Sequence, residues 1–267
     1  MVKRSPSPVT SRFSNRSLYG TPGLWKRALR NRHYSGPLHL AFEVGGRSVV
    51  YAYIRKNACT SFKKFLLVRA GITELPEGTS AIRVLSDQFR AEYLRDFVEA
   101  DRTLFVHRDP IDRAVSLYKN KFVQSREAVD IHRDYEEVLG EPAAEATFRA
   151  FVLRYLPRAG DPHTRSQRSH LYPSVYTDAV PIESLNDALR DILSPEIVDE
   201  YFARPANVSG DETYDEPTAP TIGAHELKAE LDRTGLYPSR ESLVPSGGGL
   251  HQSLLRRYAD DLIFSRS

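Results

Sequence analysis

At its most informative point the chain reads Tyr51-Ala-Tyr-Ile-Arg-Lys-Asn-Ala-Cys-Thr-Ser-Phe-Lys63. An apolar run with β propensity leads into a polar turn, and a helical pattern follows directly. The turn places Lys56, Thr60 and Ser61 where the strand stops. A helix start offers backbone N–H groups without intrahelical partners and the positive end of the helix dipole, so this joint suits an anionic group.

A second joint of the same kind lies further along the chain and reads Leu104-Phe-Val-His-Arg-Asp-Pro-Ile-Asp-Arg-Ala-Val-Ser-Leu-Tyr118. Arg108 precedes the expected helix, and Ser116 lies inside it. Pro110 occupies the first helical position, where proline is well tolerated. This joint suits a second anion, and two anion sites at neighbouring strand ends indicate one ligand with two phosphate-like groups.

The rest of the chain alternates expected strands with expected helices. Gly45-Gly46 is a two-residue hairpin signal between the first two strands. Strands are expected at 38–44, 47–54, 81–86, 103–107 and 175–182. Helices are expected at 18–32, 61–70, 88–100, 110–124, 143–155, 184–193, 195–202, 225–233 and 250–264. This alternation predicts an α/β fold whose mostly parallel sheet is covered on both faces, with the ligand at the carboxyl ends of the strands.

The composition of the 267 residues fits one large domain with additions. A net charge of +2 gives no sign of a polyanionic partner, so we expect no nucleic acid. The charge is uneven, however, because no Asp or Glu precedes Glu43 while Lys and Arg recur in that stretch. We therefore expect a basic, partly disordered arm at 1–36 and one domain at 37–267, with a loop-rich insertion at 210–249. The arm could instead help to bind an anionic substrate, contact an anionic surface or act as a transit peptide.

Cys59 is the single cysteine, so an intrachain disulfide and a cysteine-based metal cluster are excluded. The sequence shows no apolar run that approaches the roughly 20 residues of a membrane-spanning helix. We therefore expect a cytoplasmic protein without a transmembrane segment.

The two joints together resemble the sulfotransferase superfamily, in particular its carbohydrate sulfotransferase branch and the bacterial relatives of that branch. The first joint resembles the loop that holds the 5′-phosphosulfate of 3′-phosphoadenosine 5′-phosphosulfate (PAPS), and the second resembles the element that holds its 3′-phosphate. The resemblance covers roughly 38–207, with a weaker echo at the C-terminus. It implies a P-loop-like three-layer sandwich, PAPS as co-substrate, no metal, and a carbohydrate or other hydroxyl-bearing acceptor. Animal members of this branch carry an N-terminal membrane anchor, and no such anchor is expected here.

The resemblance also implies roles for individual residues. Lys56 is the expected catalytic cation, beside the leaving phosphate, although Arg55 stands where the family usually has proline. Arg108 and Ser116 are the expected ligands of the 3′-phosphate, while Ser116 could also be a purely structural helix position. The 5′-phosphosulfate is expected to contact the backbone and hydroxyl groups of Lys56, Asn57, Ala58, Cys59, Thr60 and Ser61. Cys59 is expected to be a small packing residue, because sulfuryl transfer needs no thiol.

Other residues of the second joint are expected to have structural roles. Asp109 is expected to cap the helix that Pro110 begins. Arg113 and Tyr118 match the motif and are expected to pack or to pair with neighbours.

The general base is assigned through the stretch Asp161-Pro-His-Thr-Arg-Ser-Gln167, which resembles a family element of the form His-Trp-x-Pro-Gln without its tryptophan and proline. A histidine near neutral pKa suits proton abstraction from a hydroxyl, so His163 is the expected base. His170, His107 and Glu43 are competitors.

Two other functions remain open at this point. An ATP-dependent small-molecule kinase would normally show a Gly-x-x-x-x-Gly-Lys-Ser/Thr loop, which the sequence lacks. A non-catalytic protein of the same fold that binds a nucleotide or a glycan is the other alternative. The identity of the acceptor and the oligomeric state stay unassigned.

Overall fold

A computed structural model describes residues 37–75, 77–92, 94–172, 176–203 and 212–266 of the chain. These residues form two compact units, which are described separately. Within the described residues, the first unit contains 37–54, 58–107 and 167–203, and the second contains 55–57, 108–166 and 212–266. The expected arm and the expected helix at 18–32 lie outside the described residues. In the described part of the chain, no helix is long and apolar enough to span a bilayer.

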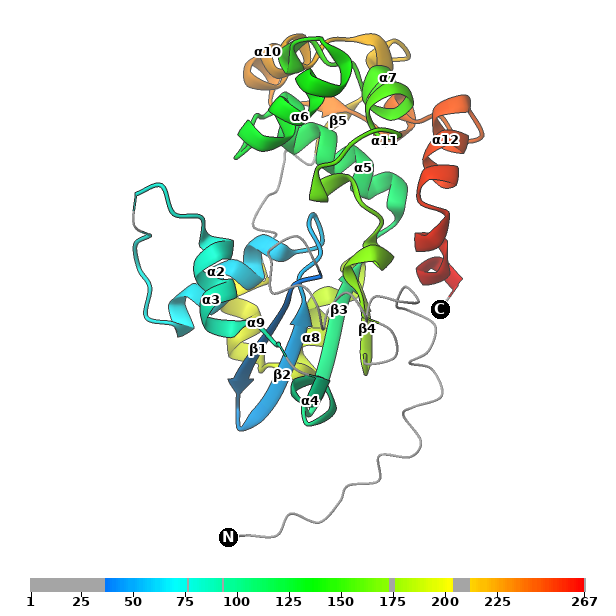
Figure 1. The fold of residues 1–267 in the computed structure, drawn as a ribbon. Helices are drawn as coiled ribbons and strands as arrows, with labels where there is room; N and C mark the ends of the chain where they lie inside the picture. Colours follow the sequence, from blue (N-terminus) through cyan, green and yellow to red (C-terminus); the bar gives the residue numbers. More distant parts are fainter. Residues whose placement is uncertain (1–36, 76, 93, 173–175, 204–211, 267) are drawn as a thin grey trace, which may run out of the picture. The chain divides into compact units, whose positions relative to one another are not determined.

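The first unit is built on a four-stranded sheet in the order β1-β2-β3-β4 (Figure 1). Its strands are β1 (His39–Val44), β2 (Arg47–Ala52), β3 (Arg102–His107) and β4 (Asp178–Pro181). β1 pairs with β2 in antiparallel fashion, whereas β2, β3 and β4 are parallel neighbours. The expected α/β fold with a mostly parallel sheet is therefore confirmed.

The expected hairpin is also present, because Gly45 and Gly46 connect β1 to β2 with φ values of 54° and 73°. Two successive residues at positive φ form the tight turn whose twist matches that of the flanking strands. Glycine adopts this conformation without the steric cost that a Cβ atom would add. The Gly-Gly pair therefore sets the register in which Val44 faces Arg47.

One face of this sheet packs against four helices: α2 (Cys59–Arg69), α3 (Ala81–Phe89), α8 (Leu185–Ile192) and α9 (Pro195–Tyr201). Alternate apolar residues of each strand point to this core, as the twofold period of a strand requires. In β2 the ring of Tyr51 stacks on Phe62 of α2 with 3.7 Å between ring centroids. The helix that follows the first joint is thus fixed to the strand that precedes it.

The opposite face of the sheet contacts a cluster of buried rings. His39 of β1 stacks on Tyr172 and meets Phe97 of α4 (Leu94–Val98) edge-on. The Tyr176 hydroxyl accepts a hydrogen bond from the Tyr172 N–H and forms a second hydrogen bond of 2.5 Å with the Nε2 atom of His39. Burial lowers the pKa of His39 to about 3, so the ring stays neutral.

The second unit is mainly helical. Its elements are α5 (Pro110–Tyr118), a π-helical turn (Lys119–Val123), α6 (Val129–Leu139), α7 (Phe148–Ala150), a second π-helical turn (Phe151–Tyr155), β5 (Thr213–Tyr214), α10 (Ala224–Thr234), β6 (Tyr237–Pro238), α11 (Arg240–Leu243) and α12 (Gly249–Arg257). Buried aromatic rings dominate its core, among them Tyr118, Phe122, Tyr135, Phe151 and Tyr155.

Several expected elements differ in the structure. The expected strand at 81–86 is wrong, since these residues begin helix α3. The β-branched residues Ile82 and Val84 favour a strand, but Ser80 caps the helix by accepting a hydrogen bond from the Arg83 N–H. The helices expected at 88–100 and 143–155 are each broken into shorter pieces, and α6 was not predicted.

Candidate active site

The loop between β2 and α2 contains two residues with left-handed backbone. Lys56 has a φ of 71° and Ala58 has a φ of 56°, and neither is glycine. Such conformations cost of order 1–3 kcal/mol each and concentrate at functional sites. Left-handed residues also help successive N–H groups of a loop to converge on an anion. This backbone therefore supports the assignment of the loop as an anion site.

Helix α2 begins at Cys59 without a side-chain cap and without an acidic residue in its first turn. An acidic side chain there would repel an anion and compete with it for the N–H groups. Ser61 is buried, and Cys59 packs with Ala58 at the margin of the first unit's core. The expectation that Cys59 is a packing residue is therefore confirmed.

The strain at Ala58 gives a stability prediction. We expect Ala58→Gly to raise the free energy of unfolding by roughly 1 kcal/mol, because glycine adopts positive φ without a Cβ clash. This corresponds to a rise of about 2–4 °C in Tm for a chain of this size. The control is Ala70→Gly, since Ala70 ends the same helix at an ordinary φ of −77°. An equal gain in both variants would show that the strain at Ala58 is not what glycine relieves.

The second joint also begins a helix, and Asp109 caps it as expected. Its Oδ1 atom accepts hydrogen bonds from the N–H groups of Ile111 and Asp112 at 2.9 and 3.0 Å. Arg108 directly precedes this cap and is half-buried. Ser116 lies two turns into α5, also half-buried, and is one turn beyond Asp112. The structure thus places both expected phosphate ligands on one helix and its entry.

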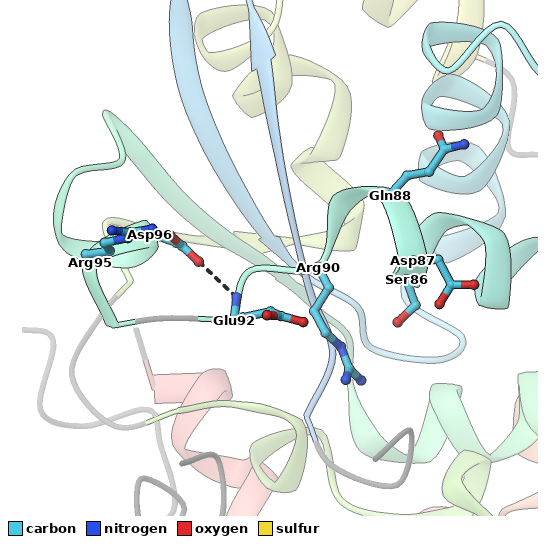
Figure 2. A pocket seen from close by; sticks show the side chains of 7 residues that line it. All are labelled: Ser86, Asp87, Gln88, Arg90, Glu92, Arg95 and Asp96. Atoms are coloured by element: carbon cyan, nitrogen blue, oxygen red, sulfur yellow. Dashed lines mark hydrogen bonds and ion pairs between the residues drawn. The ribbon is translucent and has the colours of Figure 1, made fainter. Parts of the chain in front are cut away.

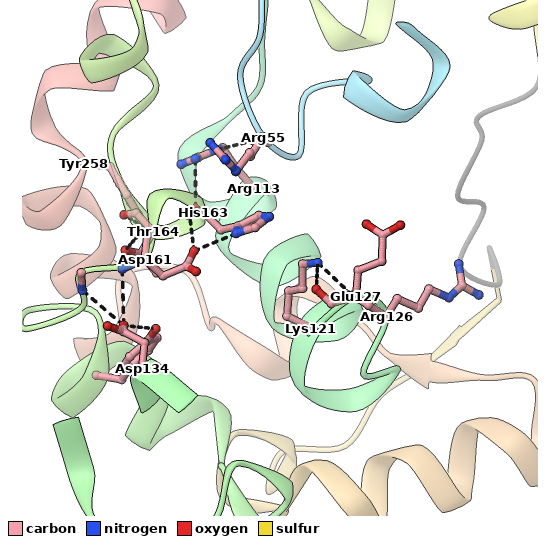
Figure 3. Close-up of polar contacts among 12 residues, drawn as sticks. Arg55, Arg113, Lys121, Arg126, Glu127, Asp134, Asp161, His163, Thr164 and Tyr258 are labelled. Atoms are coloured by element: carbon pink, nitrogen blue, oxygen red, sulfur yellow. Dashed lines mark hydrogen bonds and ion pairs between the residues drawn. The ribbon is translucent and has the colours of Figure 1, made fainter. Parts of the chain in front are cut away.

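Arg113 and Tyr118 pack and pair inside the second unit, as expected. The Tyr118 hydroxyl donates to the Ala146 carbonyl at 2.7 Å. Arg113 is 1% exposed, and its Nε donates to the Arg55 carbonyl at 3.1 Å while one terminal nitrogen donates to the His163 carbonyl at 3.1 Å (Figure 3). A motif arginine therefore connects the segment that carries Lys56 to the segment that carries His163.

His163 lies in a short 3₁₀ turn (Pro162–Thr164) that Asp161 caps. One oxygen of Asp161 accepts from the His163 N–H at 2.6 Å and lies 2.7 Å from the Nδ1 atom of the ring (Figure 3). Because a carboxylate only accepts, Nδ1 carries the proton and Nε2 keeps a lone pair. The pair has the geometry of a base with its orienting carboxylate.

The surroundings of His163 determine its protonation state. Burial lowers its pKa to about 4, Asp161 opposes this shift, and the cations Arg55 and Lys121 add to it. For Asp161, burial raises the pKa, but the hydrogen bonds from His163 outweigh burial and the net pKa is lowered. At neutral pH the pair therefore consists of a neutral imidazole and a carboxylate, so Nε2 can accept a proton, although the pKa lies well below the near-neutral value that the sequence predicts for the base.

The competitors of His163 have different surroundings. His107 ends β3 in the first unit, where burial lowers its pKa and Glu183 opposes the shift. His170 is buried in the same unit. Glu43 is exposed at the hairpin. His107 is thus a packed histidine, as expected, and the Asp161 contact distinguishes His163.

The sequence reasoning missed three groups near His163. Asp161 received no role, although its position two residues before the histidine was a usable signal. Lys121 is buried, and its ammonium donates to the carbonyls of Arg126 and Glu127, both at 2.8 Å (Figure 3). Asp134 accepts hydrogen bonds from the Tyr155 hydroxyl and from the N–H groups of Gly160 and Asp161 at the start of the turn. No local sequence pattern relates Asp134 to His163.

Two pockets outside these segments have different linings. A polar pocket of about 550 Å³ in the first unit is shown in Figure 2. Its lining residues are Ser86, Asp87, Gln88, Arg90, Glu92, Arg95 and Asp96. A more apolar hollow of about 490 Å³ in the second unit is lined by residues that include Pro217, Pro220 and Pro245. The expected site residues line neither. Among the described residues, no group of three or more His, Cys, Asp or Glu side chains is placed to hold a metal ion.

The comparison with known proteins indicates the same family that the two strand-to-helix joints resemble. The sequence profile of the sulfotransferase family matches residues 44–175. Carbohydrate sulfotransferase 14 of Mus musculus is 33% identical over 119 residues, which are 40% of this chain and 31% of the relative. Carbohydrate sulfotransferase 11 of Rattus norvegicus is 26% identical over 186 residues, which are 61% of this chain and 51% of the relative.

The chain spans about a third to about half of the length of these curated relatives. No solved structure matches it. The matched segment contains both strand-to-helix joints and the Asp161–His163 pair. Over residues 44–175 the chain resembles the sulfotransferase family, and the relatives named above are carbohydrate sulfotransferases.

Proposed function

We propose that this protein is a PAPS-dependent sulfotransferase that moves a sulfuryl group to a hydroxyl of a carbohydrate or glycoconjugate. One observation carries the proposal. Both joints of the matched family segment follow the carboxyl ends of β2 and β3, which are parallel neighbours. The carboxyl edge of a parallel sheet is where α/β folds bind their ligands. The P-loop-like three-layer arrangement belongs to this proposal, and a cytoplasmic location stays a prediction.

The proposal gives each joint one end of the nucleotide. Lys56 and residues 57–61 hold the 5′-phosphosulfate through backbone N–H groups, hydroxyls and one ammonium. Arg108 and Ser116 hold the 3′-phosphate, where a guanidinium supplies a two-pronged contact and a hydroxyl supplies a further donor. This assignment uses no metal ion, since lysine and arginine supply the positive charge.

The proposed reaction is an in-line displacement at sulfur. The acceptor oxygen forms a bond to sulfur, and the bond between sulfur and the bridging oxygen breaks. The electron pair stays on the phosphate oxygen, whose charge Lys56 stabilises. The acceptor proton moves to Nε2 of His163, which the Asp161 contact leaves unprotonated. By analogy with phosphoryl transfer, positioning and charge stabilisation provide most of the rate enhancement.

The first test is calorimetric titration with 3′-phosphoadenosine 5′-phosphate, the reaction product. We expect binding that is independent of Mg²⁺ and is lost with AMP, because AMP lacks the 3′-phosphate. Preference for ATP with Mg²⁺ would instead favour a kinase. Absence of nucleotide binding by folded protein would contradict the proposal.

A transfer assay separates an enzyme from a binding protein. With labelled PAPS and a panel of neutral and acidic oligosaccharides, an enzyme labels at least one acceptor. Nucleotide binding without transfer to any acceptor would favour a non-catalytic member of the family.

A further inference from the structure

Arg113 is more than a packed motif residue, because both of its hydrogen bonds end on backbone next to a proposed catalytic group. The Arg55 carbonyl, which accepts from its Nε, belongs to the peptide unit that leads into Lys56. The His163 carbonyl, which accepts from its terminal nitrogen, belongs to the proposed base itself. A guanidinium presents its donors in a rigid planar fork, so the two carbonyls are held at a defined separation.

The contact to Arg55 acts on a strained segment. The φ angle of Lys56 is 71°, and rotation about this angle would turn the peptide unit whose carbonyl Arg113 holds. A non-glycine residue keeps such a conformation only where its surroundings over-determine it. The hydrogen bond from Arg113 is one such restraint, and it bears on the direction of the Lys56 side chain.

The turn that carries His163 is also held by Tyr258, the residue that directly follows α12. The Tyr258 hydroxyl donates to the Thr164 carbonyl at 3.1 Å (Figure 3). The ring of Tyr258 lies 5.9 Å from the Arg113 guanidinium carbon, within the range of a cation–π contact. Tyr258 and Arg113 are both 1% exposed, so these contacts are shielded from water.

The base of the same turn is held by Asp134 of α6. Its Oδ2 atom accepts from the N–H groups of Gly160 and Asp161 at 3.2 and 3.4 Å, and from the Tyr155 hydroxyl at 2.6 Å. The Thr164 hydroxyl closes the turn by donating to the Asp161 carbonyl at 2.7 Å. The turn is thus restrained at both ends, and Arg113 also contacts the Lys56 segment through its hydrogen bond to the Arg55 carbonyl.

We propose that Arg113 and Tyr258 are positioning residues that hold the Lys56 segment and the His163 turn in register for sulfuryl transfer. The catalytic part of this inference rests on the proposed function. Neither side chain contacts a reacting atom in this assignment. Both act through Lys56 and His163, whose relative position sets the distance between leaving group and acceptor. A misplacement of about 1 Å can lower a rate by 10²-fold, so such restraints affect kcat directly.

The test compares two conservative variants with a matched control. Arg113→Lys keeps the charge but loses the planar fork. Tyr258→Phe keeps the ring over Arg113 but removes the hydrogen bond to Thr164. Tyr135→Phe is the control, because Tyr135 is fully buried in the same unit and its hydroxyl has no hydrogen-bond partner among the described residues. All three variants are compared per folded molecule, well below their Tm.

The first readout needs no activity. NMR titration of histidine ring protons between pH 5 and 8 follows His163, whose signal is assigned from its absence in His163→Gln. Asp161, Arg55 and Lys121 are the charged groups that act on it. In the wild type and Tyr135→Phe, His163 should stay neutral through this range. In Arg113→Lys and Tyr258→Phe the loosened turn admits water, so the midpoint should move upward toward 6.5.

The second readout is kinetic. We expect Arg113→Lys to lower kcat by about 10- to 100-fold and Tyr258→Phe by several-fold, with little change in the Kd of 3′-phosphoadenosine 5′-phosphate. Unchanged His163 titration in both variants, with only Tm lowered, would show that the two residues merely stabilise the fold. If the titration shifts but the wild type transfers no sulfuryl group, the positioning role stands and the proposed function fails.

Discussion

Lys56→Ala is expected to lower kcat for sulfuryl transfer by about 10²- to 10³-fold, which is the usual cost of losing one group that stabilises developing charge. The proposed role of Lys56 is to neutralise the phosphate oxygen as the bond to sulfur breaks, and this charge is largest in the transition state. Loss of an interaction that is made mainly in the transition state lowers kcat and kcat/KM together. Single-turnover transfer with labelled PAPS measures the change without interference from product release.

The control for Lys56 is Lys64→Ala. Lys64 is exposed on α2, the helix that follows the Lys56 loop, and Lys64→Ala removes the same charge. It should leave kcat close to that of the wild type, because an exposed charge is screened by solvent and salt. An equal loss in both variants would mean that general attraction of an anionic co-substrate, rather than a contact at the reacting bond, explains the effect. Full activity of Lys56→Ala would contradict the site assignment.

Local signals in the sequence predicted the parts of the fold that depend on local chemistry. The Gly45-Gly46 hairpin, the helix that follows the first joint and the Asp109 cap are all determined by residues within a few positions of each other. The expected strand at 81–86 is wrong because the β-branched side chains of this segment favour a strand, whereas the Ser80 cap favours the helix that forms. Local propensity is a weak guide when a cap and tertiary packing oppose it.

In the candidate site, too, the sequence predicts the residues that lie in short motifs but not the contacts between them. Lys56, Arg108 and His163 are recognisable because each lies in a short motif. The contacts that connect them are not, because Arg113 reaches Arg55 across 58 positions and His163 across 50. Tyr258 reaches Thr164 across 94 positions. A single sequence gives no measure of such distances in space, so the restraints on the site become visible only in the structure.

His163→Ala is expected to lower kcat by about 10²- to 10⁴-fold, the range for removal of a general base. Asp161→Asn should have a smaller effect of the same kind, because an amide no longer fixes the Nδ1 proton or stabilises the imidazolium that forms. Nucleotide affinity should change little in either variant, since neither residue is assigned to a phosphate. His225→Ala is the control, because His225 is exposed on α10 and lies in neither motif.

The pH profile tests the same pair in a way that a loss of stability cannot imitate. The base must be neutral, so kcat/KM for the free enzyme falls as the pH drops through the pKa of His163. That pKa is lowered to about 4, which places the acid limb well below the ordinary value of 6.5. Asp161 raises the pKa of His163, so Asp161→Asn should move the acid limb to still lower pH while reducing the plateau. An acid limb near 6.5 that Asp161→Asn leaves in place would assign the base to a different, solvated group.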